Sequence, residues 1–325
     1  MKVGIIGLGH GSRVLVKSFK YSKFKIYAIS SKDYNKAKQI NKIIKADKVY
    51  KNWKDLVDDN KILIVAIAVP PILQPLIIKR CIKKNKKIFA EKPLSSDYNE
   101  TKKILNKLLL YNNHFIIDYI FPEHELFKKF YKIINGKVNH NNSIIKIFFS
   151  NKSYVLKNKI KSWKSQNKMG GGLINLYLIH IIDYLILYFG KIKSVYKNST
   201  KNDLYKLELL IVFQNKINVH LQIDSDNKNQ RHYIIYENKE NKILLKNNGS
   251  DYIKNFKLTK IFLNKIKNYE NRKFYKFFRD DGRILLSSSI ANKFKKKFDK
   301  SSHIALIKRY KIVEKWINKV KKLYN

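Results

Sequence analysis

The sequence is poor in cysteine, arginine, proline and acidic residues, and these shortages exclude several classes of protein. A single cysteine, Cys81, rules out an intrachain disulfide, and no basic start followed by an apolar segment and a cleavage site opens the chain. We therefore expect a protein of the reducing cytoplasm. No H-x-x-x-H or C-x-x-C spacing occurs, so we expect no metal site.

Basic residues number 69 against 24 acidic ones, which gives a formal net charge of +45. Such an excess can indicate a nucleic-acid or anionic-membrane partner. Only seven of the basic residues are arginine, however, and the lysines are spread along the chain beside abundant Asn, Ile, Tyr and Phe, as AT-rich codons would produce. We expect no nucleic-acid partner, although the charge would attract an anionic cofactor.

The longest apolar stretch, residues 173–189, is nearly long enough to cross a bilayer. Asn175, His180 and Asp183 interrupt it, and ionisable groups at that depth are costly. The sequence therefore predicts a buried helix here and not a membrane span.

The first 120 residues alternate β-branched runs with lysine-rich amphipathic stretches. This order predicts an α/β fold with a doubly wound parallel sheet, as in Rossmann domains. The expected strands are 2–6, 25–30, 62–68, 87–90 and 115–119, and the expected helices are about 11–20, 33–44, 72–84 and 97–112.

The pattern changes from residue 143, where strand-like segments alternate with turn residues. Such a series predicts an α+β domain with a largely antiparallel open sheet, faced by the helix at 173–189. A long amphipathic helix at about 303–323 ends the chain and could pack back on the first domain. We expect a dinucleotide-binding domain at 1–120 and a substrate-binding and oligomerisation domain at 121–325.

A glycine motif, VGIIGLGHGS, directly follows the first expected strand. In a dinucleotide fold Gly7 would make the tight turn and Gly9 would let the backbone approach the pyrophosphate, which the helix N-terminus binds. The third position of G-x-G-x-x-G is Ser12, which is small but not glycine.

The second expected strand ends in YAISSKD, without the acidic residue that holds the ribose 2′-hydroxyl of NAD. Ser31 and Lys32 suit a 2′-phosphate better, and this favours NADP over NAD. The alternative is that Lys32 is one more surface lysine.

Together these motifs resemble the Gfo/Idh/MocA family of NAD(P)-dependent oxidoreductases. The resemblance is carried by GLGHGS, SSKDYNKA, IAVPP at 67–71, FAEKPLS at 89–95, WKSQNKMGGG at 163–172 and HIID at 180–183. It covers nearly the whole chain and implies a sugar or a sugar derivative as the substrate. The family also implies a homodimer or homotetramer that pairs through the outer face of the second sheet.

In that family the Glu-Lys-Pro segment lies beside the nicotinamide. The resemblance therefore implies that Glu91 contacts the cofactor and that Lys92 is the acid/base for a substrate hydroxyl, across a cis Lys92–Pro93 bond. Partial burial would lower the pKa of such a lysine. Val69 and Pro70 match the segment where the backbone passes the cofactor, with Val69 where threonine is common; Gln74 stands where histidine is common.

Trp163 and Lys164 resemble a Trp-Arg pair from which the family builds part of its substrate pocket. A tryptophan before a glycine-rich loop could equally be an anchor packed into the core.

Family members carry Asp-x-x-x-His on the helix after the glycines. His180 matches the histidine and is expected to face the substrate, but Leu176 occupies the aspartate position. On an α-helix Asn175 would lie about 140° from His180, whereas Tyr177 would lie about 60° away and could supply a phenol to the pocket. Tyr177 as a core aromatic is the alternative. Asp183 is expected to be structural.

The leading hypothesis is hydride transfer between a nicotinamide and a hydroxyl or carbonyl carbon of a sugar, with Lys92 and His180 as the catalytic residues. Because Leu176 replaces an expected carboxylate, a second hypothesis is a non-catalytic relative that binds a dinucleotide in a regulatory role.

Overall fold

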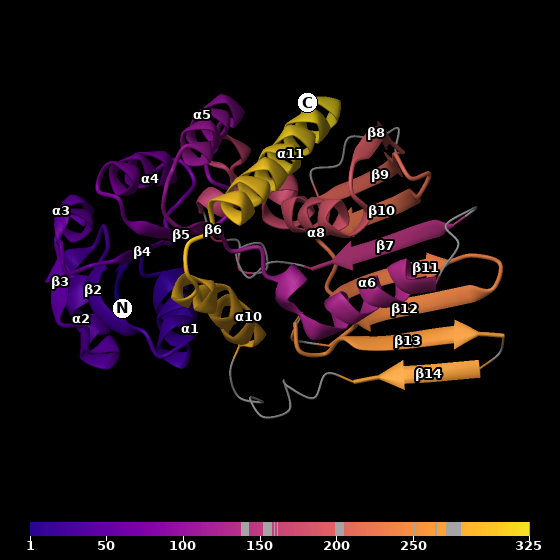
Figure 1. Ribbon diagram of the computed structural model, residues 1–325, viewed down its shortest axis with the longest axis horizontal. Helices are drawn as coiled ribbons and strands as arrows, with labels where there is room; N and C mark the ends of the chain where they lie inside the picture. The colour runs from indigo at the N-terminus through magenta and orange to yellow at the C-terminus, as the bar shows by residue number, and fades with distance from the viewer. Residues whose placement is uncertain are drawn as a thin grey trace. The chain divides into compact units, whose positions relative to one another are not determined.

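The computed structural model describes residues 1–137, 143–151, 158, 160, 162–198, 205–249, 251, 253–263, 265–270 and 281–324 (Figure 1). The chain forms two compact units. The first contains Met1–Ile120, Gln166–Gly170 and Arg283–Lys315, and the second contains Phe121–Ser165, Gly171–Gly282 and Trp316–Asn325. The second unit is thus not one continuous stretch, because the chain returns twice to the first.

The first unit is built on a six-stranded parallel sheet, which confirms the doubly wound fold. Its order is β3 (Lys48–Tyr50), β2 (Lys25–Ser30), β1 (Lys2–Ile6), β4 (Ile64–Ile67), β5 (Lys87–Ala90) and β6 (Phe115–Ile117). The helical segments are η1 (Gly11–Leu15), α1 (Val16–Tyr21), α2 (Tyr34–Ile44), α3 (Trp53–Asp58), α4 (Gln74–Lys83), α5 (Tyr98–Leu109), η4 (Asn167–Met169), α10 (Gly282–Ala291) and η6 (Asn292–Lys295). The order reverses between β1 and β4, and ligands of open α/β sheets bind at that point.

Helices α2, α3 and α5 of this unit each begin at a side-chain cap. The side chains of Asp33, Asn52 and Asp97 accept hydrogen bonds from Lys36 N, Lys54 N and Glu100 N at 2.9, 2.9 and 2.7 Å, at the starts of α2, α3 and α5. Such caps satisfy backbone donors that have no partner in the first helical turn.

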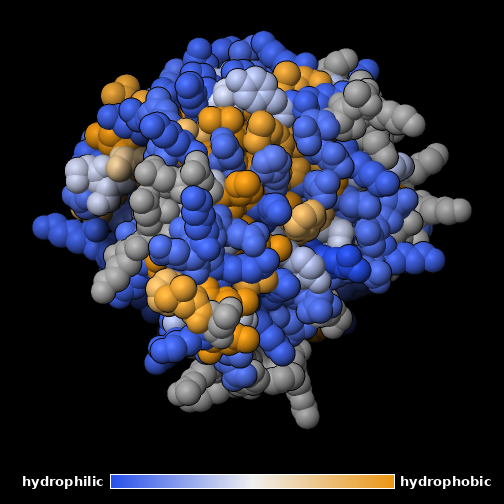
Figure 2. Space-filling view, turned by 90° about the vertical axis from the view of Figure 1, so that its right-hand side faces the viewer, coloured by the Kyte–Doolittle hydropathy of each residue, from blue (hydrophilic) through white to orange (hydrophobic). Residues whose placement is uncertain are grey.

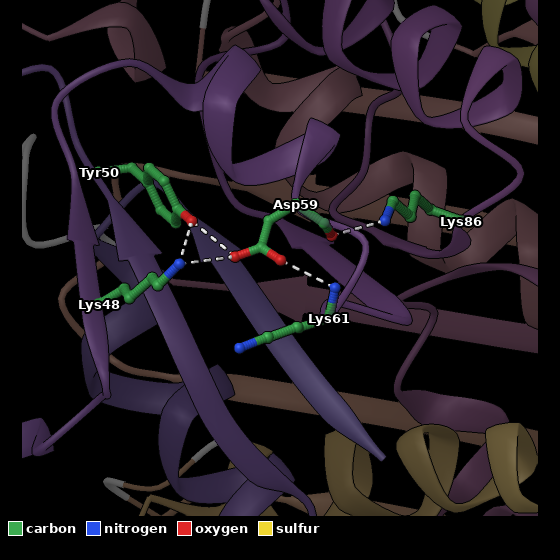
Figure 3. A network of polar contacts seen from close by, with 5 residues as sticks. All are labelled: Lys48, Tyr50, Asp59, Lys61 and Lys86. Carbon is green, nitrogen blue, oxygen red and sulfur yellow. Dashed lines mark hydrogen bonds and ion pairs between the residues drawn. The ribbon is translucent and has the colours of Figure 1, made fainter.

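Strand β3 and helix α3, which the sequence did not predict, are held by a polar network around Asp59 (Figure 3). The hydroxyl of Tyr50 donates to Asp59 Oδ2 at 2.6 Å, Lys48 Nζ lies 3.3 Å from the same oxygen, and Lys61 N donates to Oδ1 at 2.8 Å. Lys86 is buried, and its Nζ donates to the carbonyl oxygens of Asp59 and Ile62 at 2.9 and 2.7 Å. The network joins β3 to the loop before β4 and to the turn before β5.

Replacing Lys86 with Ala is expected to lower the free energy of unfolding by about 2–3 kcal/mol, because two carbonyl oxygens lose their buried donor. Lys61→Ala is the matched control, since the exposed Lys61 joins the network only through its backbone N–H. Urea unfolding of both variants checks this. Equal stability of the two variants would contradict the structural role of the Lys86 ammonium.

The second unit is built on an eight-stranded sheet, which is antiparallel except that β7 and β10 are parallel. Its order is β14 (Lys265–Tyr269), β13 (Lys257–Phe262), β12 (Asn241–Asn247), β11 (Arg231–Glu237), β7 (Ile144–Ser150), β10 (Asn218–Asp224), β9 (Lys206–Phe213) and β8 (Ile192–Lys197). The other elements are η2 (Phe121–Glu123), α6 (Glu125–Lys137), η3 (Trp163–Ser165), η5 (Ile174–Leu178) and α8 (Ile179–Phe189). Helix α11 (Lys300–Tyr324) contributes residues to both units.

Helices α6 and α8 lie across one face of this sheet (Figure 1). Burial alternates along β9, β10 and β11, so one face of each strand is buried and the other is partly exposed. Together with the antiparallel strand pairs, this alternation confirms the prediction of a largely antiparallel sheet.

Among the residues that the structure describes, one helical stretch, Asn167–Phe189, is long and apolar enough to cross a membrane by length and composition. In the protein 67% of its most apolar window is buried, which is typical of a core helix. On the face that Figure 2 shows, hydrophilic residues predominate and hydrophobic residues form smaller patches between them.

Candidate functional site

The glycine turn after β1 places each glycine in a different environment. Gly7 has φ +92°, and a Cβ there would lie 2.3 Å from the carbonyl oxygen of Ala68, so only glycine fits. A Cβ at Gly9 would meet nothing within 4 Å, so this backbone is open to a ligand. A Cβ at Gly11 would lie 3.1 Å from Ile5 Cγ2. In dinucleotide folds the third glycine of the motif allows the helix to pack closely on the strand. Here Gly11, one residue before that position, allows this close packing.

Ser12 lies in η1, whereas Ser31 and Lys32 directly follow β2. The Ser12 hydroxyl donates to the carbonyl of Leu8, within the turn. Ser31 is partly exposed and Lys32 is exposed. Asp33, the first acidic residue after β2, accepts the capping hydrogen bond of α2 from Lys36 N.

The segment after β4 borders the glycine turn. Val69 Cγ1 would lie 3.0 Å from a Cβ at Gly7, and Pro70 follows in a turn that Leu73 N closes on the Pro70 carbonyl at 2.9 Å. A Cβ at Gly170 would lie 2.7 Å from Pro71 Cβ, so the first glycine of the GGG run packs on this segment within the first unit.

The Glu-Lys-Pro segment follows β5, and its Lys92–Pro93 bond is cis, as expected. Glu91 N donates to the carbonyl of Ile67 at 3.0 Å. Gln74 is buried at the start of α4, and its Nε2 donates to the carbonyl of Pro93 at 2.7 Å. Gln74 thus fixes the backbone next to Lys92, whose side chain is partly exposed.

Four polar side chains that lie far apart in the sequence meet beside Lys92. His10 Nε2 lies 2.9 Å from Glu91 Oε1. A ring nitrogen of His10 and one carboxylate oxygen each of Glu91 and Asp118 all lie within 4.8 Å of one another. The Ser287 hydroxyl, from α10, lies 2.9 and 3.2 Å from the two Asp118 oxygens. Of these four residues only Glu91 belongs to a motif that the sequence reveals.

The two carboxyl groups of this cluster have opposite pKa shifts. Burial alone would raise the pKa of Glu91, but the charges of His10 and Lys92 outweigh it and hold the pKa below its usual value. Burial, followed by the charge of Glu91, raises the pKa of Asp118 well above its usual value, although Ser287 and Arg283 oppose the shift. Glu91 is thus the ionised member and Asp118 the protonated one.

Trp163 and Lys164 belong to the second unit, in the turn η3. Lys164 Nζ lies 6.0 Å from the centre of the Trp163 ring. A Cβ at Gly171 would lie 2.2 and 2.5 Å from the carbonyl oxygens of Trp163 and Lys164, so their backbone packs directly on the glycine run. Both side chains are partly exposed.

His180 and Tyr177 each pack against an aromatic ring of the second unit. The His180 ring lies edge-on to Phe121 at 5.5 Å, and the Tyr177 ring lies 5.0 Å from Phe149. Leu176, Tyr177 and His180 are all partly exposed, whereas Asp183 is fully buried.

The geometry expected for Asn175 was wrong. Residues 174–178 form a π-helical segment in which Ile179 N bonds to the carbonyl of Ile174, five residues back. The turn therefore holds an extra residue, and the separation of about 140° between Asn175 and His180, calculated for an α-helix, does not apply. Asn175 is buried, and its Nδ2 donates to the Gly171 carbonyl at 3.0 Å. It fixes the glycine run instead of facing away from it.

Residues 1–118 match the model of the Gfo/Idh/MocA oxidoreductase family, described as an NAD-binding Rossmann fold. The first 118 residues are thus similar to this family. The Gfo/Idh/MocA match includes the glycine turn, Glu91 and Lys92, and it ends at Asp118. Trp163, Tyr177 and His180 lie outside it.

The chain is 25% identical over 199 residues to an uncharacterized oxidoreductase of Synechocystis sp., a match that covers 61% of this chain and 54% of the relative. It spans about half the length of the curated relatives that it matches. Among solved structures, levoglucosan dehydrogenase in complex with NADH and levoglucosan has a TM-score of 0.75 at 13% identity, over 97% of this chain and 96% of that one. The 3-ketoreductase KijD10 from Actinomadura kijaniata, with NADP and TDP-benzene, has a TM-score of 0.77 at 11% identity, over 98% and 96%. These structures share the fold of both units.

Proposed function

We propose that this protein is an NAD(P)-dependent oxidoreductase that transfers a hydride between a nicotinamide and a hydroxyl or carbonyl carbon of a sugar or sugar derivative. The observation that carries the proposal is the meeting of the glycine turn, the Val69–Pro70 segment and Lys92 at the carboxyl ends of the adjacent strands β1, β4 and β5. Two proteins with the same fold support it, one solved with NADH and levoglucosan and the other with NADP and a TDP derivative.

In this mechanism Lys92 is the acid/base. When the substrate is oxidised, Lys92 accepts the hydroxyl proton while the bound cofactor supplies the acceptor for the hydride from the same carbon. In the reverse direction Lys92 returns the proton to the carbonyl oxygen. His180 orients the reacting oxygen, Tyr177 is a candidate auxiliary donor, and Trp163 and Lys164 contribute to substrate binding.

We infer a preference for NADP from the end of β2. Ser31 and Lys32 are accessible there, and Asp33 already accepts the capping bond of α2. A lysine and a hydroxyl suit a 2′-phosphate, whereas a free carboxylate would suit the 2′-hydroxyl of NAD.

The binding of NAD⁺, NADH, NADP⁺ and NADPH, detected by a signal from the protein, tests the proposal. Turnover of a panel of sugars and nucleotide sugars is then measured from the absorbance of the nicotinamide. We expect NADP(H) to bind at least several-fold more tightly than NAD(H), and Lys32→Ala to weaken only NADP(H). Absence of binding to any cofactor would refute the proposal. Binding without turnover of any sugar would favour a non-catalytic relative, the alternative that Leu176 raises by standing where the family has an aspartate.

We further infer a cytoplasmic homodimer or homotetramer. The less buried face of the second sheet carries partly exposed apolar side chains on the neighbouring strands β7 and β11, namely Phe148, Tyr233 and Ile235, which a second copy could cover. A monomeric mass by light scattering would contradict this inference.

A further inference from the structure

The cluster of His10, Glu91, Asp118 and Ser287 brings two carboxyl groups, an imidazole and a hydroxyl together. Its members come from four places in the first unit: the glycine turn, the end of β5, the end of β6 and helix α10. Asp118 N also donates to the carbonyl of Ala90 at 3.0 Å, so the backbone fixes Asp118 next to the residue that precedes Glu91. The two carboxyl groups are therefore held together by the sheet.

Two buried carboxyl groups this close cannot both be ionised at low cost, so one of them keeps a proton. Asp118 is 4% exposed and bonds to a neutral hydroxyl, whereas the Glu91 side chain is 18% exposed, lies 2.9 Å from His10 Nε2 and faces the positive charge of Lys92. The proton therefore resides on Asp118, and the Asp118 O–H group donates a hydrogen bond to the Glu91 carboxylate. On the side of α10, Arg283 is the charged group that acts on Asp118, and it opposes retention of the proton.

The cluster also has an exit for this proton. Exposure of the side chains increases from Asp118 through Glu91 at 18% to His10 at 26%. When the pair loses its proton, the proton passes from Asp118 to Glu91 and from the partly exposed Glu91 carboxyl to solvent. No bond other than these O–H bonds forms or breaks. The site gains one negative charge beside Lys92.

We propose that Asp118 and Glu91 share one proton, and that this proton sets the relative affinity of the site for oxidised and reduced nicotinamide cofactors. The inference rests on the proposed function, because it requires that the nicotinamide binds beside Glu91 and Lys92. The oxidised ring carries a positive charge and the reduced ring does not. Loss of the shared proton thus favours the oxidised ring, because unit charges a few ångströms apart near a protein surface interact strongly enough to change binding about 10–100-fold.

The experiment measures dissociation constants of NADP⁺ and NADPH from about pH 5.5 to about pH 9.5 by protein fluorescence, in EDTA so that no metal occupies the three side chains. In the wild-type protein the ratio of the NADPH constant to the NADP⁺ constant is expected to rise about 10–100-fold with pH. Asp118→Asn mimics the protonated acid, so its ratio should remain at the low-pH value throughout. A contact that only supports the fold would change both constants together and leave the ratio constant.

Ser287→Ala is the second variant and keeps the test decisive if Asp118→Asn does not fold. The Ser287 hydroxyl stabilises the ionised form of Asp118, so its removal should shift the rise in the ratio to higher pH. Ser289→Ala is the matched control on the same helix, because the Ser289 hydroxyl bonds instead to the carbonyl of Leu285 at 3.2 Å. Its ratio should follow the wild-type curve.

A wild-type ratio that does not change with pH, or a wild-type pH dependence that survives in Asp118→Asn, would overturn the proposal. A ratio whose pH dependence disappears when EDTA is added would also overturn it, since a bound metal would then carry the effect. Failure of the proposed function has a different signature, namely that wild-type protein binds neither NADP⁺ nor NADPH, nor the NAD forms, at any pH.

Discussion

Replacing Lys92 with Met is expected to lower kcat about 10²–10⁴-fold for the sugar that the substrate panel identifies, with little change in the dissociation constant of the cofactor. Methionine has a similar length and no proton to exchange, so the variant removes the acid/base and keeps the packing. Because Gln74 holds the Pro93 carbonyl independently of the Lys92 side chain, we expect the cis segment to keep its position.

Lys92→Arg separates the two roles that a lysine could have at this position. Arginine keeps the positive charge beside Glu91 but does not release its proton, so an acid/base role predicts an inactive Lys92→Arg, whereas a purely electrostatic role predicts an active one. Lys102→Met, an exposed lysine on α5, is the matched control and should leave kcat unchanged. A Lys92→Met variant with a kcat within about threefold of wild type would exclude the acid/base role.

Local sequence signals predicted the scaffold of this site well. The five predicted strands of the first sheet are present because β-branched runs bounded by turn residues identify buried parallel strands without further information. The tight turn at Gly7 was predictable from a different local signal, a glycine pair that directly follows a strand. Strand β3 was missed because it is only three residues long and two of them, Lys48 and Tyr50, contribute to a polar network that no local pattern reveals.

The parts of the site that the sequence could not predict depend on contacts between distant residues. His10, Asp118 and Ser287 meet only because β1, β4, β5 and β6 lie side by side and α10 returns to the first unit after residue 282. The π-helical segment at 174–178 was equally hidden, for a different reason. This helix carries apolar residues on every face, so one inserted residue disturbs no hydrophobic stripe.

Lowering the pH from 8 to 5 is expected to cost the second unit about 4 kcal/mol of stability through two buried histidines. The ring of His232 is almost fully buried among Phe121, Phe149 and Phe256, with centroid distances of 5.0, 5.1 and 5.3 Å. Burial lowers the pKa of His232 to about 3. Burial likewise lowers the pKa of His124 to about 4.

The hydrogen bonds of His124 require a neutral ring. Leu126 N donates to His124 Nδ1 at 3.2 Å, so Nδ1 carries no proton, and Nε2 donates to the carbonyl of Ile253 at 3.0 Å. In the unfolded chain both histidines titrate near pH 6.5. Below that pH the unfolded chain binds protons that the folded unit does not, so stability falls as the pH falls. The loss at pH 5 is about 2 kcal/mol for each histidine.

Urea unfolding gives the free energy of unfolding of the second unit at pH 8 and at pH 5, and the loss is the difference between these two values. The packing cost of a substitution is the same at both pH values and cancels in this difference. His232→Gln and His124→Gln should each reduce the difference by about 2 kcal/mol, and the double variant by about 4. His220→Gln is the matched control, because His220 is exposed on β10 and meets solvent in both states. If both buried variants keep the wild-type difference, then the acid sensitivity of this unit comes from its carboxylates and not from its histidine core.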